Sequence, residues 1–479
     1  MTKTLEPDLC VVGAGAAGLS AASIAASLGA SVVLVERGTM GGDCLNHGCV
    51  PSKALIAAAE RAHAQATSAP FGVKAREPEV DMLAVREHVR GVIAGIAPVD
   101  SVERYRALGV AVLQESARFA DARTLLVGET TIRPRRVVLA TGSRPALPEI
   151  PGLDRTPHLT NETIFDLGRR PKHLLVIGAG PVGMELAQAF RRLGSAVTVI
   201  ANGEALPRED REAAGIVVAA LRADGVTIHE GAAIDRAEPA EEGVRVALRL
   251  ASGHERLLDG SHLLVAVGRR PVVEDLGLEA AGIAHGPDGI RVDARLRTSN
   301  KRVYAIGDCA TGGTGGLRLT HAAGQHASLV VRQALFGVPA RFDPALVPRA
   351  TYTDPEIASV GLSEEEAFAK DARARILRWP LAENDRARAE RTTSGLIKAI
   401  VARNGRIMGC TIVAPHAGEL IAPWTLALAK GLTARDLAGL VMPYPTLSEI
   451  TKRAAVEDLK GLALNPWLGR LRNLVRWLG

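Results

Sequence analysis

Two copies of one glycine pattern constrain the fold of this 479-residue chain more than any other feature. In the first copy, the apolar segment Leu9–Val12 runs directly into Gly13-x-Gly15-x-x-Gly18. An alanine-rich segment follows, and then a second apolar segment that ends at Glu36. This order predicts a strand, a tight turn, a helix and a second strand, which together form a dinucleotide-binding unit.

Each glycine of this first unit, and its terminal acid, has a physical reason to be there. Gly13 permits the turn, Gly15 lets the backbone approach a pyrophosphate, and Gly18 allows the helix to pack closely on the strand. The helix N-terminus offers free N–H groups and the positive end of its dipole. Glu36 follows Gly18 by 18 residues, where an acid accepts hydrogen bonds from a ribose 2′-hydroxyl.

The second copy lies in HLLVIGAGPVGMELAQAFRRLGSAVTVI, residues 173–200, with Gly178, Gly180 and Gly183. Its offset from the first copy is 178 − 13 = 165 residues, so it belongs to a second domain and not to a short repeat. Two such domains predict two cofactors, such as a flavin and a nicotinamide, that exchange a hydride.

The second unit lacks the terminal acid of the first. It continues as Ile200-Ala201-Asn202 where the first unit has Glu36. A carboxylate there would repel a 2′-phosphate, so its absence favours NADPH and leaves NADH as the alternative.

Composition excludes several other classes of protein. Hydrophobic residues make up 47% and there are 49 glycines, which fits an α/β globular protein of several domains. Aromatic residues at 3% and a net charge of +6 argue against nucleic-acid binding. Five cysteines are too few for a disulfide-stapled secreted protein, and MTKTLEPDLC does not resemble a signal peptide. We therefore expect a reducing, cytoplasmic location.

Two of the cysteines lie close together in GGDCLNHGCVPSK, residues 41–53. Only His47 accompanies Cys44 and Cys49, which is too few ligands for zinc or an iron–sulfur cluster, so no metal site is predicted. A structural bridge over so short a loop would constrain little chain entropy. Pro51 suits the first position of a helix, which places Cys49 just before a helix N-terminus that favours its thiolate. The segment is therefore interpreted as a redox pair.

These features and several later motifs resemble the class I pyridine nucleotide–disulfide oxidoreductases, the family of glutathione reductase, dihydrolipoamide dehydrogenase and mercuric reductase. The resemblance covers about residues 8–455. Besides the cysteine segment, its motifs are Ala140–Gly142, Val267–Arg269, Tyr304–Asp308, Thr353–Gly361 and Pro445–Glu449.

The resemblance implies a role for each matching residue. Cys49 would face the flavin of FAD as the charge-transfer thiol, and Cys44 would be the interchange thiol that meets the substrate. Lys53 and Glu185 match an ion pair near the reactive edge of the flavin, and Asp308 would lie near its ribitol and pyrophosphate. The implied cofactor-binding residues are Gly13, Gly15, Gly18, Glu36, Gly42, Lys53, Thr141, Gly142, Gly178, Gly180, Gly183, Glu185, Gly268 and Asp308.

The family's arrangement gives an α/β fold class, with two Rossmann-like dinucleotide-binding domains and a C-terminal α+β dimerisation domain. The FAD-binding domain would comprise residues 1–149 and 271–345, and the NAD(P)-binding domain residues 150–270. Residues 346–460 would form the interface of a homodimer, with strands in LIKAIVA and GRIMGCTIVA. In the family, the C-terminal motif of this domain completes the partner's active site.

One position departs from the disulfide reductases of the family. They have His before the Pro-Thr of the last motif, where VMPYPTLSE has Tyr444, while the Glu that holds that His remains as Glu449. Tyr has an ordinary pKa of about 10 and is a poor proton shuttle at neutral pH. Tyr444 is therefore interpreted either as catalytic or as an interface packing residue.

Mercuric reductases also carry Tyr near this point. They deliver metal through vicinal C-terminal cysteines, however, and this chain ends in NLVRWLG without them. Mercury reduction is therefore expected only as a weak side activity.

Residues 461–479 form a basic tail in which PWLGRLRNLVRWLG predicts an amphipathic helix. Trp467, Leu471 and Val475 would share one face with other apolar residues, opposite Arg472 and Arg476. One interpretation is peripheral attachment to an anionic membrane at the inner face. The other, slightly favoured, is docking on the protein itself or on its dimer partner.

Taken together, the sequence predicts an NAD(P)H-dependent flavoprotein enzyme acting on a small-molecule substrate. It would pass hydride from nicotinamide to FAD, then to a Cys44–Cys49 disulfide and on to an acceptor that needs little proton donation. The first alternative is a dihydrolipoamide dehydrogenase. The second, from another class, is a membrane-docked redox-sensing or binding flavoprotein with little turnover.

Overall fold

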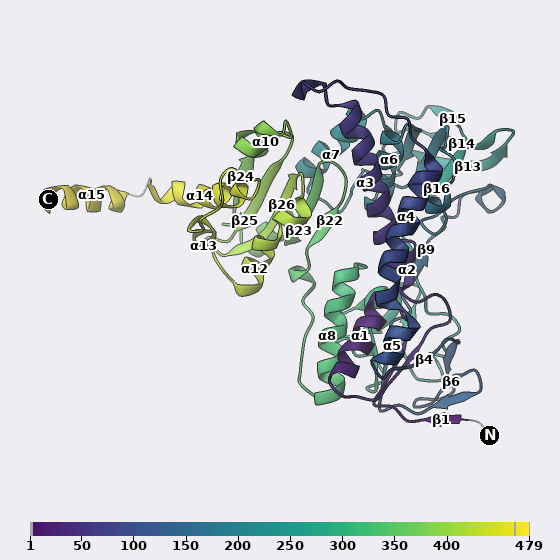
Figure 1. The fold of residues 1–479 in the computed structure, drawn as a ribbon. Coiled ribbons are helices and arrows are strands. Elements are labelled where there is room, and N and C mark those ends of the chain that lie inside the picture. The colour runs from purple at the N-terminus through teal and green to yellow at the C-terminus, as the bar shows by residue number, and fades with distance from the viewer. Residues whose placement is uncertain (1–2, 464–465, 479) are drawn as a thin grey trace. The chain divides into compact units, whose positions relative to one another are not determined.

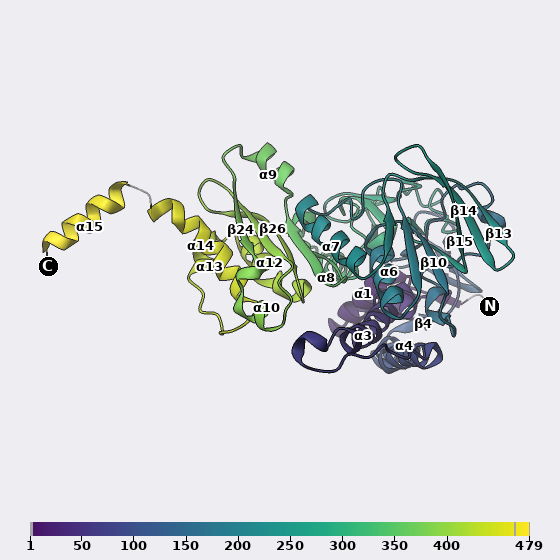
Figure 2. The same cartoon turned by 90° about the horizontal axis from the view of Figure 1, so that it is seen from above.

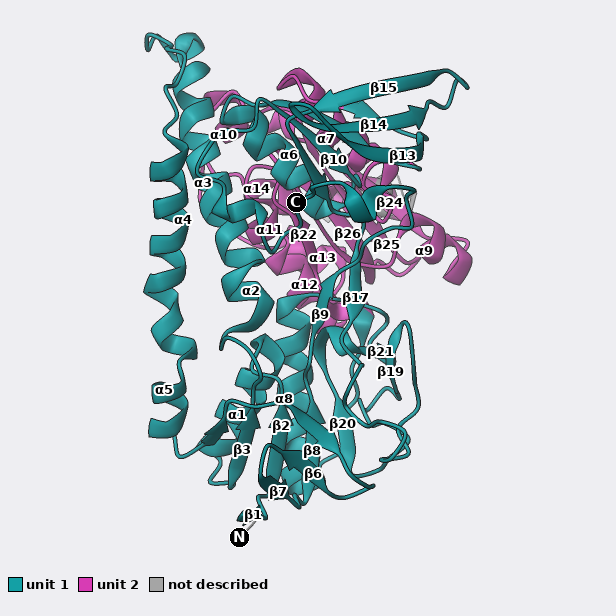
Figure 3. Ribbon diagram, turned by 90° about the vertical axis from the view of Figure 1, so that its right-hand side faces the viewer, with its two compact units in different colours: residues 1–202, 228–344 teal, residues 203–227, 345–479 magenta. Residues whose placement is uncertain are grey.

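The computed structural model describes residues 3–463 and 466–478, and its contacts divide the chain into two compact units (Figures 1 and 3). Unit 1 comprises residues 1–202 and 228–344, and unit 2 comprises residues 203–227 and 345–479. Both units combine helices with sheets, so the predicted α/β fold class is confirmed.

The first sheet of unit 1 is built from two distant stretches of the chain. Its central strands β2 (Leu9–Val12) and β3 (Val32–Val35) are buried along their whole length, as expected for parallel strands covered on both faces. The strand order is β20-β8-β2-β3-β4, with β4 (Ala111–Leu113), β8 (Arg136–Leu139) and β20 (Val303–Ala305). Helices α1 (Ala16–Ser27) and α8 (Thr320–Phe336) pack against each other beside this sheet.

The second parallel sheet of unit 1 has the order β12-β11-β10-β16. Its strands are β10 (His173–Ile177), β11 (Ala196–Ile200), β12 (Thr227–His229) and β16 (His262–Val265), and α6 (Pro181–Arg192) follows β10. An antiparallel ribbon of β13 (Ala233–Ala240), β14 (Gly243–Arg249) and β15 (Glu255–Gly260) is visible in Figure 2. Smaller strands are β1 (Lys3–Leu5), β5 (Ala117–Phe119), β6 (Leu125–Val127), β7 (Thr130–Ile132), β9 (Ser143–Pro145), β17 (Arg269–Pro271), β18 (His285–Gly286), β19 (Gly289–Val292) and β21 (Ala310–Gly312).

Four helices of unit 1 contain the cysteine segment or follow it in the sequence. They are α2 (Gly42–Asn46), α3 (Cys49–Ala66), α4 (Met82–Ile96) and α5 (Val102–Ala107). The prediction that a helix begins at Pro51 is wrong by two residues. The helix already begins at Cys49, because proline is tolerated throughout the first turn, where N–H groups have no partner within the helix.

Unit 2 is built on an antiparallel sheet of order β22-β23-β26-β25-β24. The two predicted strands are present as β25 (Leu396–Val401) and β26 (Ile407–Ala414), beside β22 (Arg349–Thr351), β23 (Glu356–Gly361) and β24 (Arg375–Pro380). Trp424 is fully buried in its core. Its helices are α7 (Arg211–Ala223), α9 (Glu364–Lys370), α10 (Asp385–Ala389), α11 (Ala417–Leu420), α12 (Ala422–Lys430), α13 (Ala434–Ala438), α14 (Glu449–Ala463) and α15 (Pro466–Leu478).

The tail forms the predicted helix α15, which carries large exposed apolar side chains. Trp467 is 73% and Trp477 is 82% exposed. Across the described parts of the chain, no helix has both the length and the apolar character that crossing a bilayer requires.

Candidate active site

The first glycine turn brings three backbone segments into close contact. Gly13 has φ of 103°, and a Cβ atom there would lie 2.4 Å from the carbonyl oxygen of Ala140. A Cβ on Gly18 would lie 1.8 Å from the oxygen of Gly13, and one on Gly42 would lie 2.6 Å from the Cα of Gly15. Only glycine fits these positions, so the start of α1 stays free of side chains.

Glu36 lies beside this turn at the end of β3. Its carboxylate accepts hydrogen bonds from the backbone N–H of Ala14 at 2.6 Å and of Gly38 at 2.8 Å. A cavity of about 130 Å³ is lined by Gly13, Glu36, Thr141 and other residues. A bare helix N-terminus, a fixed carboxylate and an adjoining cavity are what the diphosphate and ribose of FAD require, so these residues fit that cofactor.

The second glycine turn repeats this geometry at the end of β10. Gly178 has φ of 108°, and a Cβ atom there would lie 2.5 Å from the oxygen of Ala266. A Cβ on Gly183 would lie 2.0 Å from the oxygen of Gly178, whereas Gly180 has open space. Gly268, in the segment that follows β16, has φ of 135°. The turn therefore also leaves a helix N-terminus accessible to a diphosphate.

The two thiols of the cysteine segment are adjacent and reduced in this structure. The Cys44 thiol donates to Cys49, and the Cys49 sulfur lies 3.5 Å from the Thr320 hydroxyl. The hydrogen bond from Cys44 is the main cause that lowers the pKa of Cys49 to about 6, helped by Thr320 and by the positive charge of Lys53. The same hydrogen bond raises the pKa of Cys44. The proton therefore stays on Cys44, and Cys49 is the thiolate at neutral pH.

Lys53 and Glu185 form the ion pair that the sequence suggested. The Lys53 Nζ lies 2.8 Å from a carboxylate oxygen of Glu185, which joins α3 to α6. The Glu185 side chain is only 6% exposed, so it depends on this partner. Lys53 lowers the pKa of Cys49 and Glu185 raises it, so the pair tunes the nearby thiolate with opposite signs.

A polar network that the sequence analysis did not predict holds Asp43, the residue that precedes Cys44. Arg269 forms an ion pair with Asp43 at 3.0 Å and donates a hydrogen bond to the Ser143 hydroxyl at 2.7 Å. Ser143 donates in turn to Asp308 at 2.6 Å, and Asn161 donates to Asp43 at 3.1 Å. Burial raises the pKa of Asp308, against the effects of Ser143 and Arg269. The one local signal was the position of Arg269 directly after Gly268 in a recognisable motif.

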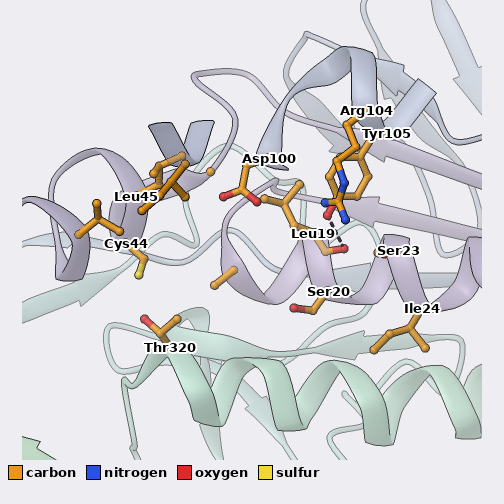
Figure 4. Close-up of a pocket in the computed structure, with 14 residues that line it drawn as sticks. Leu19, Ser20, Ser23, Ile24, Cys44, Leu45, Asp100, Arg104, Tyr105 and Thr320 are labelled. Atoms are coloured by element: carbon orange, nitrogen blue, oxygen red, sulfur yellow. Dashed lines mark hydrogen bonds between the residues drawn. The ribbon is translucent and has the colours of Figure 1, made fainter. Parts of the chain in front are cut away.

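Cys44 also lines a groove of about 530 Å³ along helix α1 (Figure 4). The groove runs past Leu19 and Ser20 towards Ser23 and Arg104, while Cys49 is not part of its lining. At its far end the Tyr105 hydroxyl donates to the carbonyl oxygen of Leu19 at 3.1 Å. A molecule in this groove would therefore meet Cys44 and not Cys49.

Tyr444, on the described part of unit 2, is 69% exposed. Its hydroxyl donates to a carboxylate oxygen of Asp385 at 3.1 Å. Glu449, which sequence reasoning placed beside it, begins helix α14 and affects the phenol only through its charge. The hydrogen bond to Asp385 is the main cause that raises the pKa of Tyr444.

Two further histidines, His326 and His47, make contacts within the fold. His326 is fully buried, its Nδ1 accepts from the backbone N–H of Gly307, and its ring meets Phe342 edge-on at 4.2 Å. Burial lowers the pKa of His326 to about 4, so it is neutral. The backbone oxygen of His47 accepts from Asn161. In the described residues, no three His, Cys, Asp or Glu side chains gather as metal ligands do.

Known proteins are similar to this chain over most of its length. The family model of the pyridine nucleotide-disulphide oxidoreductases matches residues 7–327, and that of their dimerisation domain matches residues 347–455. A mercuric reductase of Streptomyces lividans is 38% identical over 94% of this chain and 95% of its own. A dihydrolipoyl dehydrogenase of Thermus scotoductus is 39% identical over 94% of this chain and 96% of its own.

A solved structure has the same fold. It is the Cu(II) complex of the HOCl-induced flavoprotein disulfide reductase RclA from Escherichia coli. It superposes with a TM-score of 0.81 at 28% identity, over 92% of this chain and 98% of that one.

The matches extend over both units and include the dimerisation domain, so the protein forms a homodimer and acts on a small-molecule substrate. Its cofactors are FAD and NAD(P)H, as in the rest of the family. The chain belongs to the pyridine nucleotide-disulphide oxidoreductases and is an FAD-dependent NAD(P)H:disulfide oxidoreductase.

Proposed function

We propose that this enzyme reduces an electrophilic acceptor, an activated disulfide or a metal ion, at Cys44. The observation that carries the proposal is the division of one proton between the two cysteines, with Cys44 lining the groove. The matching glycines, Glu36 and Asp308 would hold FAD, which when bound takes two electrons from NAD(P)H and passes them to the disulfide.

The thiols then act in a fixed order. Two electrons and one proton open the Cys44–Cys49 disulfide into a Cys44 thiol and a Cys49 thiolate. As Cys44 attacks one sulfur of an acceptor disulfide, its own proton is released and the first acceptor thiolate departs. The Cys49 thiolate attacks the Cys44 sulfur, which expels the second acceptor thiolate and closes the cysteine disulfide. The net products are the closed Cys44–Cys49 disulfide, two acceptor thiolates and one proton, which is released to solvent.

The choice of acceptor class rests on Tyr444. An ordinary disulfide has a basic leaving thiolate that needs a proton, and a phenol with a raised pKa is a poor donor for it. An activated disulfide or a metal ion needs no such proton. The similar reductase whose solved structure is a Cu(II) complex adds support for a metal acceptor.

An anaerobic titration followed by an acceptor screen tests the proposal. Two electrons from NADPH should produce a long-wavelength thiolate–flavin band, and 5,5′-dithiobis(2-nitrobenzoate) or Cu(II) should discharge it faster than oxidised glutathione. If oxidised glutathione discharged the band as fast as the activated disulfide, the proposed acceptor class would be wrong.

The second candidate is a dihydrolipoamide dehydrogenase, favoured by the 39% identical relative of that name. Tyr444 in place of His speaks against it, because lipoamide turnover moves a proton to and from a basic thiolate. A direct assay with dihydrolipoamide and NAD distinguishes the two candidates, and rapid turnover would favour the second.

We also propose that NADPH is preferred to NADH. Strand β11 ends at Ile200, and buried Ala201 and exposed Asn202 follow where a carboxylate would repel a 2′-phosphate. The ratio of kcat/KM values for the two nucleotides measures this preference.

We also propose the domain boundaries at residues 149, 270, 345 and 460 that the sequence predicts. The two compact units of the structure are divided at other positions, after residues 202, 227 and 344.

For helix α15 we propose docking on the protein or its dimer partner, with one alternative: peripheral contact with an anionic membrane surface, at the inner face of a cytoplasmic location. Exposed Trp467, Trp477 and Leu474 would enter the interface, while Arg472 and Arg476 meet acidic headgroups. Co-sedimentation with phosphatidylserine vesicles, with and without residues 461–479, tests this contact. Equal pelleting would favour docking on the protein or its partner instead. It would also remove the alternative of a membrane-docked redox sensor.

A further inference from the structure

The groove along helix α1 contains an acidic side chain that the proposed reaction does not use. Among the described residues that line the groove, Asp100 supplies the one carboxylate and Arg104 the one cation. In the view of Figure 4, Asp100 lies between Cys44 and Arg104. Apolar side chains, among them Leu19 and Leu45, form much of the remaining lining. Water therefore screens a charge in this groove less than it screens a charge on an open surface.

The Asp100 carboxylate has no structural role in the neighbouring helices. Asp100 ends the short 3-10 helix Ala97–Asp100, and α5 begins two residues later. Ser101 caps α5, because its hydroxyl accepts a hydrogen bond from the backbone N–H of Arg104 at 3.2 Å. In the part of the chain that the structure describes, the Asp100 side chain forms neither a hydrogen bond nor an ion pair. The carboxylate is therefore available to a bound molecule.

The neighbouring cation Arg104 is already engaged. Its guanidinium donates to the backbone oxygen of Val99 and lies 5.7 Å from the centre of the Tyr105 ring. Its charge lowers the pKa of Asp100, but burial is the larger cause and raises that pKa. Burial also raises the pKa of Tyr105 to about 12, so the phenol is neutral. A further cation close to Asp100 would therefore stabilise its carboxylate.

We propose that the groove takes acceptors with a cationic group, such as an ammonium, and that Asp100 binds this group while Cys44 meets the reacting sulfur. The inference rests on the proposed function and names the class of acceptor for the same site. An ammonium has three N–H donors and can satisfy the carboxylate oxygens of Asp100. The apolar lining suits the carbon chain between the ammonium and the sulfur. An acceptor with a carboxylate in this place would meet Asp100 as a like charge.

Three small 2-pyridyl disulfides that differ in one group test the proposal on the full-length holoenzyme. They are 2-(2-pyridyldithio)ethylamine, 2-(2-pyridyldithio)ethanol and 3-(2-pyridyldithio)propionic acid, which are cationic, neutral and anionic at neutral pH. In each case NADPH and one proton from solvent reduce the S–S bond, which gives pyridine-2-thione and an alkyl thiol. Initial rates of thione release at saturating NADPH give kcat/KM for each probe.

Asp100→Asn should change the preference among the three probes. The ratio of kcat/KM for the amine to kcat/KM for the alcohol should fall about tenfold, the range of one charge-assisted hydrogen bond. The change should lie mainly in KM, because Asp100 binds a group that does not react. The ratio of the acid to the alcohol should rise, since the repulsion between like charges is removed. A merely structural role of Asp100 would not move the two ratios in opposite directions.

Glu103→Gln is the matched control, because Glu103 is an exposed acid of α5 outside the groove lining. It removes an equal charge and should leave both ratios unchanged. The proposal would be overturned if Asp100→Asn left the amine-to-alcohol ratio unchanged. An equal fall of this ratio in Glu103→Gln would also overturn it, because the effect would then come from overall charge.

The proposed function and the inference about Asp100 fail in distinguishable ways. The long-wavelength band of the NADPH-reduced enzyme reports on Cys49 and is measured without any acceptor. If wild type forms no such band, the proposed function fails and the inference fails with it. If the band forms and the ratios do not respond to Asp100→Asn, only the inference about Asp100 fails.

Discussion

The cysteine pair and the Tyr444 segment are both short reactive stretches, yet they are held very differently. Thr320 and Arg269, from distant parts of unit 1, contact Cys49 and the residue before Cys44, and the charge of Lys53 acts on Cys49 from within the same helix. Tyr444 is largely exposed, and one hydrogen bond to Asp385 orients its hydroxyl. The cysteine pair therefore lies in a dense polar framework, whereas the orientation of the Tyr444 hydroxyl depends on a single contact that one substitution can change.

Replacing each cysteine should have the largest effect on activity, and it tests the roles of the two thiols directly. Cys49→Ser should abolish the long-wavelength band and reduce turnover at least about 1,000-fold, because the thiolate that we propose to face the flavin is lost. Cys44→Ser should keep the band and lose turnover. Anaerobic absorbance spectra and NADPH oxidation measure the two properties. Retention of the band in Cys49→Ser would reverse the assigned roles of the thiols.

The charge of Lys53 should set the pH range of the thiolate. Because the pKa of Cys49 is lowered to about 6, the band should be full above that pH and should fade as the pH drops through it. Lys53→Met should move the midpoint to higher pH, since it removes a positive charge that favours the thiolate.

A spectroscopic pH titration of the reduced enzyme gives this midpoint. Lys172→Met provides the control, because its exposed pair with Glu242 belongs to the same unit. A midpoint that Lys53→Met leaves in place would show that hydrogen bonds alone sustain the thiolate.

Replacement of Tyr444 by His tests the proposed role of the Tyr444 segment. An imidazole beside Asp385 can carry a proton near neutral pH, so Tyr444→His should increase kcat/KM for oxidised glutathione by about 10- to 100-fold. Turnover of the activated disulfide should change much less. Steady-state assays of both disulfides measure the contrast, and equal gains for both would indicate a general effect on folding or dimerisation.

The smallest effect is expected from the tail. Deletion of residues 461–479 should change kcat for a water-soluble acceptor by less than about twofold, because no residue assigned to the candidate site lies in the tail and most surface changes have small energetic consequences. Gel filtration of the shortened enzyme should still give a dimer. A large loss of kcat would place the tail within the catalytic unit.

Local patterns predicted the scaffold better than its polar contacts. Strand Leu9–Val12 has the predicted bounds, since a continuous apolar run followed by glycine defines both the strand and its end. The adjacency of Cys44 and Cys49 follows from their spacing. The start of α3 was misplaced because proline tolerates several positions in a first helical turn.

The contacts between Arg269 and Asp43, and between Tyr444 and Asp385, join residues far apart in the sequence. Neither hydrophobic periodicity nor local secondary-structure propensity predicts such long-range pairs. Glu449 was the expected neighbour of Tyr444 because it lies five residues away in a familiar motif, yet the carboxylate that binds the hydroxyl comes from 59 residues upstream. Only the fold decides which of several acids reaches a given group.

The anchoring of Asp43 has a consequence for how the protein is made. Its partners Asn161 and Arg269 leave the ribosome long after Cys44 and Cys49 have been synthesised. Asp43 can therefore reach its full set of contacts only after residue 269 has been synthesised, long after both cysteines.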